Sequence, residues 1–251
     1  MHMDKKMARL LTRGQGQSER SWMYRKSYLF IITMGISLGL TWLAGGVGVA
    51  HAEGFSLEQI AKGLQGTYEQ TTDFKARFIQ EVTLASVNRK EREEGTVYYK
   101  PPQRMLWDYT KPKVKKLIIN PTKAYLYVPQ DKAVYVQDTG KLFKSQVLVR
   151  LLNGLGKVTE DFNLAFVNAK EPTDEGGHYL LSLTPKKGDL GVDRILITVH
   201  KDDFTIIQCR FSDVYGNRTT VFFRNIVINS NLPDKLFQFK PPPKVEIYPM
   251  P

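Results

Sequence analysis

The chain is poor in the residues that form cross-links, metal sites and nucleophilic active sites. Its 251 residues contain one cysteine, Cys209, which excludes an internal disulfide and a cysteine-ligated zinc or iron–sulfur centre. Four histidines leave little room for a histidine-based metal site: His2, His51, His178 and His200. The sequence has no G-x-S-x-G motif, no H-E-x-x-H motif and no glycine-rich phosphate loop. We therefore expect no metal, no cofactor and no enzyme of a familiar type.

Positive charge is concentrated at the N-terminus. The chain carries 36 Lys+Arg against 25 Asp+Glu, a net charge of +11. Residues 5–26 are basic, residues 28–50 are mostly apolar, and Ala50-His51-Ala52 follows. This order predicts a secretory signal peptide over residues 1–52, cleaved after Ala52, and therefore an exported protein; an uncleaved membrane anchor is the alternative. Translation starting at Met7 or Met23 would shorten the basic region.

Removing residues 1–52 changes the interpretation of the charge. Residues 53–251 keep 29 basic and 23 acidic residues, a net charge of +6. Much of the excess therefore belongs to targeting, and we expect no nucleic-acid partner. No cysteine lies near the cleavage site, so the chain cannot be lipidated there.

Residues 53–251 read as one domain of helix followed by strands. Ser56 to Gln59 form a capping-box pattern, and apolar residues at helical spacing predict a helix over 56–71. From Asp73 the period changes to two. Turn residues then separate predicted strands at 92–100, 104–110, 115–120, 124–129, 133–137, 162–168, 177–184, 192–200, 205–212, 218–228 and 236–240. A second helix is predicted over 142–155, and the prolines from Pro241 onward cannot lie inside a regular ladder. About eleven strands imply one antiparallel sheet large enough to curl.

Residues 95–136 are rich in aromatic side chains. By alternation Met105, Trp107 and Tyr109 share one face of their strand. Either these side chains fill an ordinary core, or a curled sheet presents them to a cavity for an apolar ligand. The lysines between two of these strands form either a solvated loop or a contact for an anionic membrane or an acidic partner; they are Lys111, Lys113, Lys115 and Lys116.

The order of several segments resembles that of a known family. The segments are 73–80 (DFKARFIQ), 94–102 (EGTVYYKPP), 104–109 (RMLWDY), 211–220 (FSDVYGNRTT) and 237–242 (FQFKPP). Together they resemble LolA, the periplasmic carrier of outer-membrane lipoproteins. The resemblance implies a mainly β (α+β) fold, an incomplete antiparallel β-barrel of about eleven strands closed by a helical lid. It also implies a carrier that binds acyl chains, performs no covalent chemistry and uses no cofactor.

The resemblance also assigns residues. The expected acyl-chain-binding residues are Phe74, Phe78, Met105, Trp107, Tyr109, Leu117, Ile119, Tyr125 and Tyr127. The expected lid residues are Leu64, Tyr68, Leu148, Leu151 and Leu152. Where many members carry an arginine that holds the lid, this chain has Pro101, and Arg104 is the candidate substitute.

The implied partners are lipoprotein acyl chains and an inner-membrane ABC exporter of the LolCDE type, with an outer-membrane acceptor of the LolB type left open. We expect a monomer. A LolB-type receptor is disfavoured because it needs a lipidated cysteine directly after its signal, and Cys209 is far from that position. A lipid or glycolipid carrier of the same half-barrel fold, a secreted hydrolase with an unrecognised site, and a basic periplasmic scaffold remain as alternatives.

Overall fold

The computed structural model describes residues 54–145, 149, 151–152, 158–186 and 191–250. These residues all belong to one compact unit, His51–Pro251. The predicted signal peptide at 1–52 and the expected lid residue Leu148 lie outside the described residues. Within the described ranges, no helix is both long and apolar enough to cross a membrane.

Two runs of consecutive strands make up most of the described chain, and short helices precede and separate them. The helices are α1 (Leu57–Glu69), α2 (Thr139–Ser145) and α4 (Val158–Asp161), with 3-10 turns η1 (Pro129–Asp131) and η3 (Asp234–Phe237). The first six strands are β1 (Phe74–Leu84), β2 (Arg89–Lys100), β3 (Arg104–Lys111), β4 (Lys115–Ile119), β5 (Lys123–Val128) and β6 (Ala133–Asp138). The other six are β7 (Phe162–Phe166), β8 (Tyr179–Pro185), β9 (Ile195–Val199), β10 (Ile206–Ser212), β11 (Arg218–Ile228) and β12 (Glu246–Pro249).

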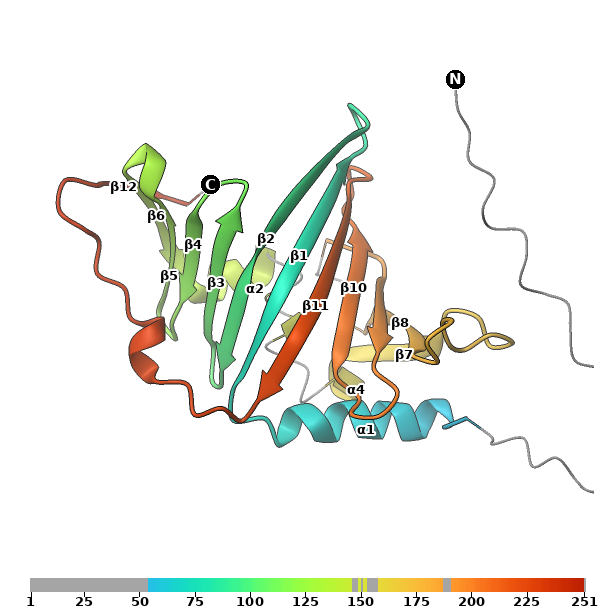
Figure 1. Cartoon of the computed structure of the whole chain (residues 1–251). Coiled ribbons are helices and arrows are strands. Elements are labelled where there is room, and N and C mark those ends of the chain that lie inside the picture. Colours follow the sequence, from blue (N-terminus) through green and yellow to red (C-terminus); the bar gives the residue numbers. More distant parts are fainter. Residues whose placement is uncertain (1–53, 146–148, 150, 153–157, 187–190, 251) are drawn as a thin grey trace, which may run out of the picture. The chain divides into compact units, whose positions relative to one another are not determined.

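The strands form one open sheet in the order β12-β6-β5-β4-β3-β2-β1-β11-β10-β9-β8-β7 (Figure 1). All neighbours pair antiparallel except β12, which runs parallel to β6. Because β12 and β7 stand at opposite ends of the order and do not pair, the sheet does not close. The predicted fold class, an incomplete antiparallel barrel, is confirmed, with twelve strands in place of about eleven.

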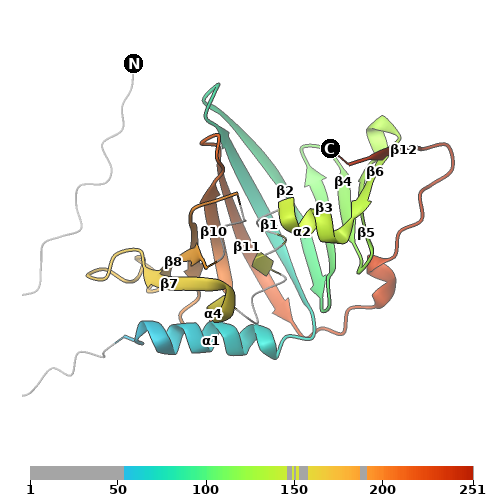
Figure 2. The ribbon, with the colours of Figure 1, turned by 180° about the vertical axis from the view of Figure 1, so that it is seen from behind.

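The helices lie on one side of the sheet. In Figure 1 α2 and α4 are behind the strands, and in Figure 2, from the opposite direction, they are in front. Helix α1 runs across the strand ends beside α4, and its apolar residues Ile60 and Leu64 join the main hydrophobic cluster. We call the side that carries Phe78, Met105 and Trp107 the inner face, and the opposite side the outer face.

Local sequence signals explain where the first elements begin. The Ser56 amide donates to Gln59 Oε1 at 2.8 Å, and the Gln59 amide donates to Ser56 Oγ at 3.2 Å. This reciprocal pair is the capping box predicted from the sequence, and it satisfies donors that the first helical turn leaves free. In β1 the buried residues Phe74 and Phe78 alternate with exposed neighbours, as a half-buried strand requires.

Two sequence expectations near the C-terminus differ from the structure. The predicted strand at 236–240 is wrong, because η3 occupies 234–237 and Phe237 is buried on the outer face. The apolar side chains of this segment pack on the outer face of the sheet, and its backbone does not pair with a strand. Beyond the prolines, β12 forms a ladder at the edge of the sheet, where one side of a strand has no partner and Pro249 is tolerated.

Candidate functional site

The inner face carries a continuous apolar surface built by alternation along β1, β3 and β4. Six of the expected acyl-chain residues are buried in one cluster, and a seventh, Leu117, packs against it; the six are Phe74, Phe78, Met105, Trp107, Tyr109 and Ile119. Strand pairing explains their proximity, since Trp107 lies opposite Leu117 on β4 and Met105 lies opposite Ile119. The structure thus brings seven of the nine expected residues together.

Aromatic rings form the centre of this surface. Phe78 meets Trp107 edge to face at a centroid distance of 4.9 Å and meets Tyr109 at 5.0 Å. Phe223, from β11, approaches Trp107 at 6.4 Å. Edge-to-face pairs of this kind contribute about 0.5–1.5 kcal/mol each beyond the burial of their area. The centre of the inner face is therefore a closely packed group of aromatic rings.

A separate layer of aliphatic side chains covers the inner face. Leu142, Val149, Leu151 and Leu152, which we call the lid cluster, are all buried in the same cluster as Trp107. They follow β6 directly, and Thr139 anchors their start, donating from Oγ1 to the Asn120 carbonyl at 2.7 Å. Of the expected lid residues, Leu151 and Leu152 thus lie over the inner face.

Helix α1 is fixed to the β9–β10 turn by polar contacts. Thr67 Oγ1 donates to the Asp203 carbonyl at 2.9 Å, and Tyr68 Oη accepts a hydrogen bond from the Ile206 amide at 3.1 Å. A Cβ on Gly63 would come within 2.7 Å of the Phe204 ring, so only glycine permits this approach. Leu64, another expected lid residue, is part of this helix, and its side chain is buried in the main cluster. Helix α1 is thus fixed to the sheet by both polar and apolar contacts.

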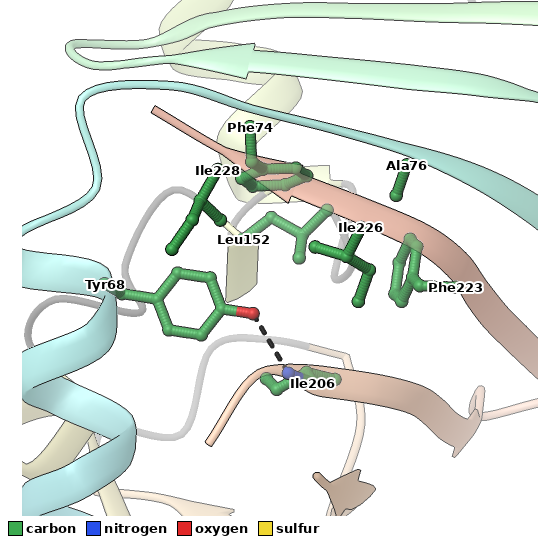
Figure 3. A pocket seen from close by; sticks show the side chains of 8 residues that line it. All are labelled: Tyr68, Phe74, Ala76, Leu152, Ile206, Phe223, Ile226 and Ile228. Carbon is green, nitrogen blue, oxygen red and sulfur yellow. Dashed lines mark hydrogen bonds between the residues drawn. The ribbon is translucent and has the colours of Figure 1, made fainter. Parts of the chain in front are cut away.

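A small cavity lies where α1, the lid cluster and β11 meet. Figure 3 shows the side chains that line it: Tyr68, Phe74, Ala76, Leu152, Ile206, Phe223, Ile226 and Ile228. The space left for a water-sized sphere is about 10 Å³, roughly what one buried water needs. This cavity is therefore too small to hold an acyl chain, and Leu152 of the lid cluster forms part of its wall.

Tyr125 and Tyr127 lie on the outer face, contrary to the expectation that they join the apolar site. Their rings pack on Phe239 at 5.3 and 5.6 Å. The pairing register is the reason, because Tyr125 lies opposite Ile118, whose side chain belongs to the outer cluster. Residues on one face of a sheet stay on that face across neighbouring strands.

Arg104 also lies on the outer face. It alternates with Met105, and its guanidinium donates to the Pro101 carbonyl at 3.0 Å. The structure therefore does not bring this arginine to the lid. The lysines of the predicted basic loop have nearby carboxylates: Lys115 with Glu93 at 2.6 Å, Lys116 with Asp108 at 3.3 Å and Lys111 with Glu94 at 3.7 Å. Because these lysines already have carboxylate partners within the chain, the pairs favour a loop without a membrane or protein partner.

Sequence reasoning missed the contribution of β11. Phe223, Ile226 and Ile228 all line the cavity, although strict alternation from Phe223 would turn Ile226 and Ile228 outward. A bulge at Asn225, whose φ is +52°, adds one residue and restores them to the inner face. An asparagine between two apolar pairs is a weak sequence signal for such a bulge.

Burial favours the neutral forms of two inner-face tyrosines and of the single cysteine. Burial raises the pKa of Tyr99 to about 12, and burial together with the nearby Glu93 raises that of Tyr109. Burial also raises the pKa of the Cys209 thiol to about 12, so it is not a nucleophile at neutral pH. No group of three His, Cys, Asp or Glu residues suited to a metal ion occurs in the described part of the chain. The arrangement suits an apolar ligand.

An open curved sheet whose apolar inner face is covered by a layer of aliphatic side chains is the architecture of a binding protein for hydrophobic ligands. Residues 69–240 match the family model of the outer membrane lipoprotein carrier protein LolA. The match spans more than half of the chain, which belongs to the LolA family.

Curated relatives carry the same description. The outer-membrane lipoprotein carrier protein of Methylobacillus flagellatus is 25% identical over 220 residues, covering 88% of this chain and 98% of that one. The protein of the same name from Pseudomonas aeruginosa is 27% identical over 206 residues, covering 82% and 93%. A LolA superfamily crystal structure from Nitrosomonas europaea covers 74% of this chain and 98% of that one, with 14% identity and a TM-score of 0.42.

Proposed function

We propose that this protein carries lipoproteins across the periplasm, binding their acyl chains on the inner face and delivering them to the outer membrane. The observation that carries the proposal is the apolar inner face, against which the lid cluster packs and where the cavity beside Leu152 measures about 10 Å³. Membership of the LolA family supports the lipoprotein as cargo. No observation favours a glycolipid carrier or a hydrolase.

The energetics allow both loading and release. Burying one methylene is worth about 0.8 kcal/mol, so a chain of roughly fifteen methylenes gains about 12 kcal/mol. The four buried side chains of the lid cluster gain about 1.5–3 kcal/mol each when the lid is closed. Since an entering chain displaces these contacts, most of its gain is offset, and the cargo can leave again.

The proposed binding residues are those that share the inner face. The acyl-chain set is Phe74, Phe78, Met105, Trp107, Tyr109, Leu117 and Ile119, and the lid set is Leu64, Tyr68, Leu148, Leu151 and Leu152. Tyr125, Tyr127 and Arg104 are left out because they lie on the outer face.

The proposed route begins with export and cleavage after Ala52. The domain 53–251 then acts as a monomer, takes cargo from an exporter of the LolCDE type and passes it to an acceptor of the LolB type. N-terminal sequencing of the periplasmic protein checks the first step and should begin at Glu53. A protein that keeps residues 28–50 in the membrane would contradict it.

The function itself is tested with inner-membrane vesicles that contain the exporter and a labelled lipoprotein. Wild-type protein should bring the lipoprotein into the soluble fraction in a one-to-one complex. Leu117→Ala, on the inner face, should reduce this release. Tyr127→Ala, a half-buried residue on the outer face of the neighbouring strand, is the matched control and should not. Absence of soluble lipoprotein with wild-type protein would overturn the proposal.

A further inference from the structure

One buried hydrogen-bond donor on the inner face has no partner. Among the described residues, two buried polar side-chain atoms make no hydrogen bond, Trp107 Nε1 and His200 Nδ1. His200 Nδ1 lies 3.3 Å from the Asp203 carboxylate, so it has an electrostatic partner. The Trp107 residue is 2% exposed, and its N–H has no acceptor among the described residues.

The surroundings of Trp107 explain why the protein supplies no acceptor. In the part of the chain that the structure describes, its cross-strand neighbours are Val97 on β2 and Leu117 on β4, and its ring packs against Phe78 and Phe223. All four are apolar. A phenylalanine would also fill this position with an aromatic ring and would leave no donor unpaired, whereas an unpaired buried donor is rare in native proteins. The unpaired indole N–H is therefore better explained by an acceptor on a ligand than by packing alone.

We infer that the indole N–H of Trp107 donates a hydrogen bond to the carbonyl oxygen of a bound fatty acyl group, an ester or an amide. This inference rests on the proposed function. An acyl chain is apolar except at its carbonyl, which loses its water on entering the inner face and needs a donor there. Indole is a donor only, so it matches an acceptor oxygen and nothing that must itself donate. One hydrogen bond thus satisfies two groups that would otherwise be buried unpaired.

This contact gives the site a chemical preference. A ligand with a carbonyl at the head of its chain binds more tightly than an alkyl ether of equal length. The net value of one hydrogen bond corresponds to about a threefold to tenfold difference in affinity. The purely apolar part of the surface does not distinguish the two.

The test compares hexadecanoic acid methyl ester with hexadecyl methyl ether, by displacement of a fluorescent fatty acid from the periplasmic protein. Wild-type protein should prefer the ester about threefold to tenfold. Trp107→Phe should bring the ratio near one by weakening the ester, with the ether changed by less than about twofold. Phe223→Leu is the matched control: it removes a neighbouring ring but no donor, so both ligands should weaken and the ratio should stay.

A second measurement does not depend on the variants being stable at the binding temperature. Trp107 is the single tryptophan of residues 53–251, so the one indole peak in a ¹⁵N–¹H spectrum of the periplasmic protein belongs to it. This peak should shift downfield with the ester and not with the ether. An equal ester-to-ether ratio in wild type and Trp107→Phe, or equal peak shifts with both ligands, overturns this inference while leaving apolar binding intact. Failure of wild-type protein to bind either ligand overturns the proposed function instead.

Discussion

Leu152→Ala is expected to destabilise the closed lid and, as a result, to tighten the binding of an acyl ligand. Leu152 is 2% exposed and lines the small cavity together with Tyr68, Phe74 and Phe223 (Figure 3). It belongs to the lid cluster, so its contacts exist only while the lid lies on the inner face. Shortening it therefore destabilises the closed state selectively.

The size of the effect follows from the burial. Replacing a buried leucine by alanine costs about 2–5 kcal/mol in a packed site. Apparent affinity equals the intrinsic affinity multiplied by the fraction of protein in the open, competent state. Since about 1.4 kcal/mol is a factor of ten, Leu152→Ala should tighten the apparent dissociation constant for an acyl ligand by about tenfold or more, although the free energy of unfolding falls.

The assay is displacement of a fluorescent fatty acid, with urea unfolding measured on the same samples. Leu106→Ala is the matched control, because Leu106 is also a buried leucine, 6% exposed, and belongs to the cluster on the outer face. Both variants should lose stability, and only Leu152→Ala should gain affinity. If Leu152→Ala binds no more tightly than Leu106→Ala, the lid does not compete with cargo and the reasoning is wrong.

Three further predictions follow from individual contacts. Met105→Glu places a charge at a fully buried inner-face position. It should impair lipoprotein transfer more than it lowers the melting temperature, because the carboxylate reaches water when the lid opens. If the variant fails to fold, Met105 is an ordinary core residue. Asp73 is 1% exposed, and burial favours its neutral form, but hydrogen bonds from Ser230 and nearby amides outweigh burial and lower its pKa. Asp73→Asn should cost about 1–3 kcal/mol in urea unfolding at neutral pH; the wild-type advantage should disappear as the pH falls below about 4, through the lowered pKa, and an advantage unchanged at pH 2 would contradict this. Gly95→Ala should cost about 1–3 kcal/mol, because a Cβ there would lie 2.2 Å from the Asp108 carbonyl oxygen, whereas Gly66→Ala, in open space on α1, should stabilise by about 0.5–1 kcal/mol; equal effects of the two would refute the clash.

Local signals were enough to locate most of the elements. The capping box at Ser56 marked the start of α1, and the 218–228 prediction matches the bounds of β11. Turn residues separated the strands correctly because they act through the backbone of a few adjacent residues. The strand expected at 236–240 failed, since apolar residues between prolines satisfy alternation whether they pair with a strand or dock onto a face.

The composition of the site was only partly readable from the sequence. Alternation shows that Met105 and Trp107 share a face, and equally that Tyr125 and Tyr127 do. It does not say which of the two faces is covered, because both faces of this sheet carry apolar clusters. The period of a sequence is a property of one strand. Which face of the sheet a side chain joins depends on the register between strands and on bulges such as the one at Asn225. Which of the two faces is covered depends on where the lid cluster packs. Those are long-range contacts, and only the folded chain decides them.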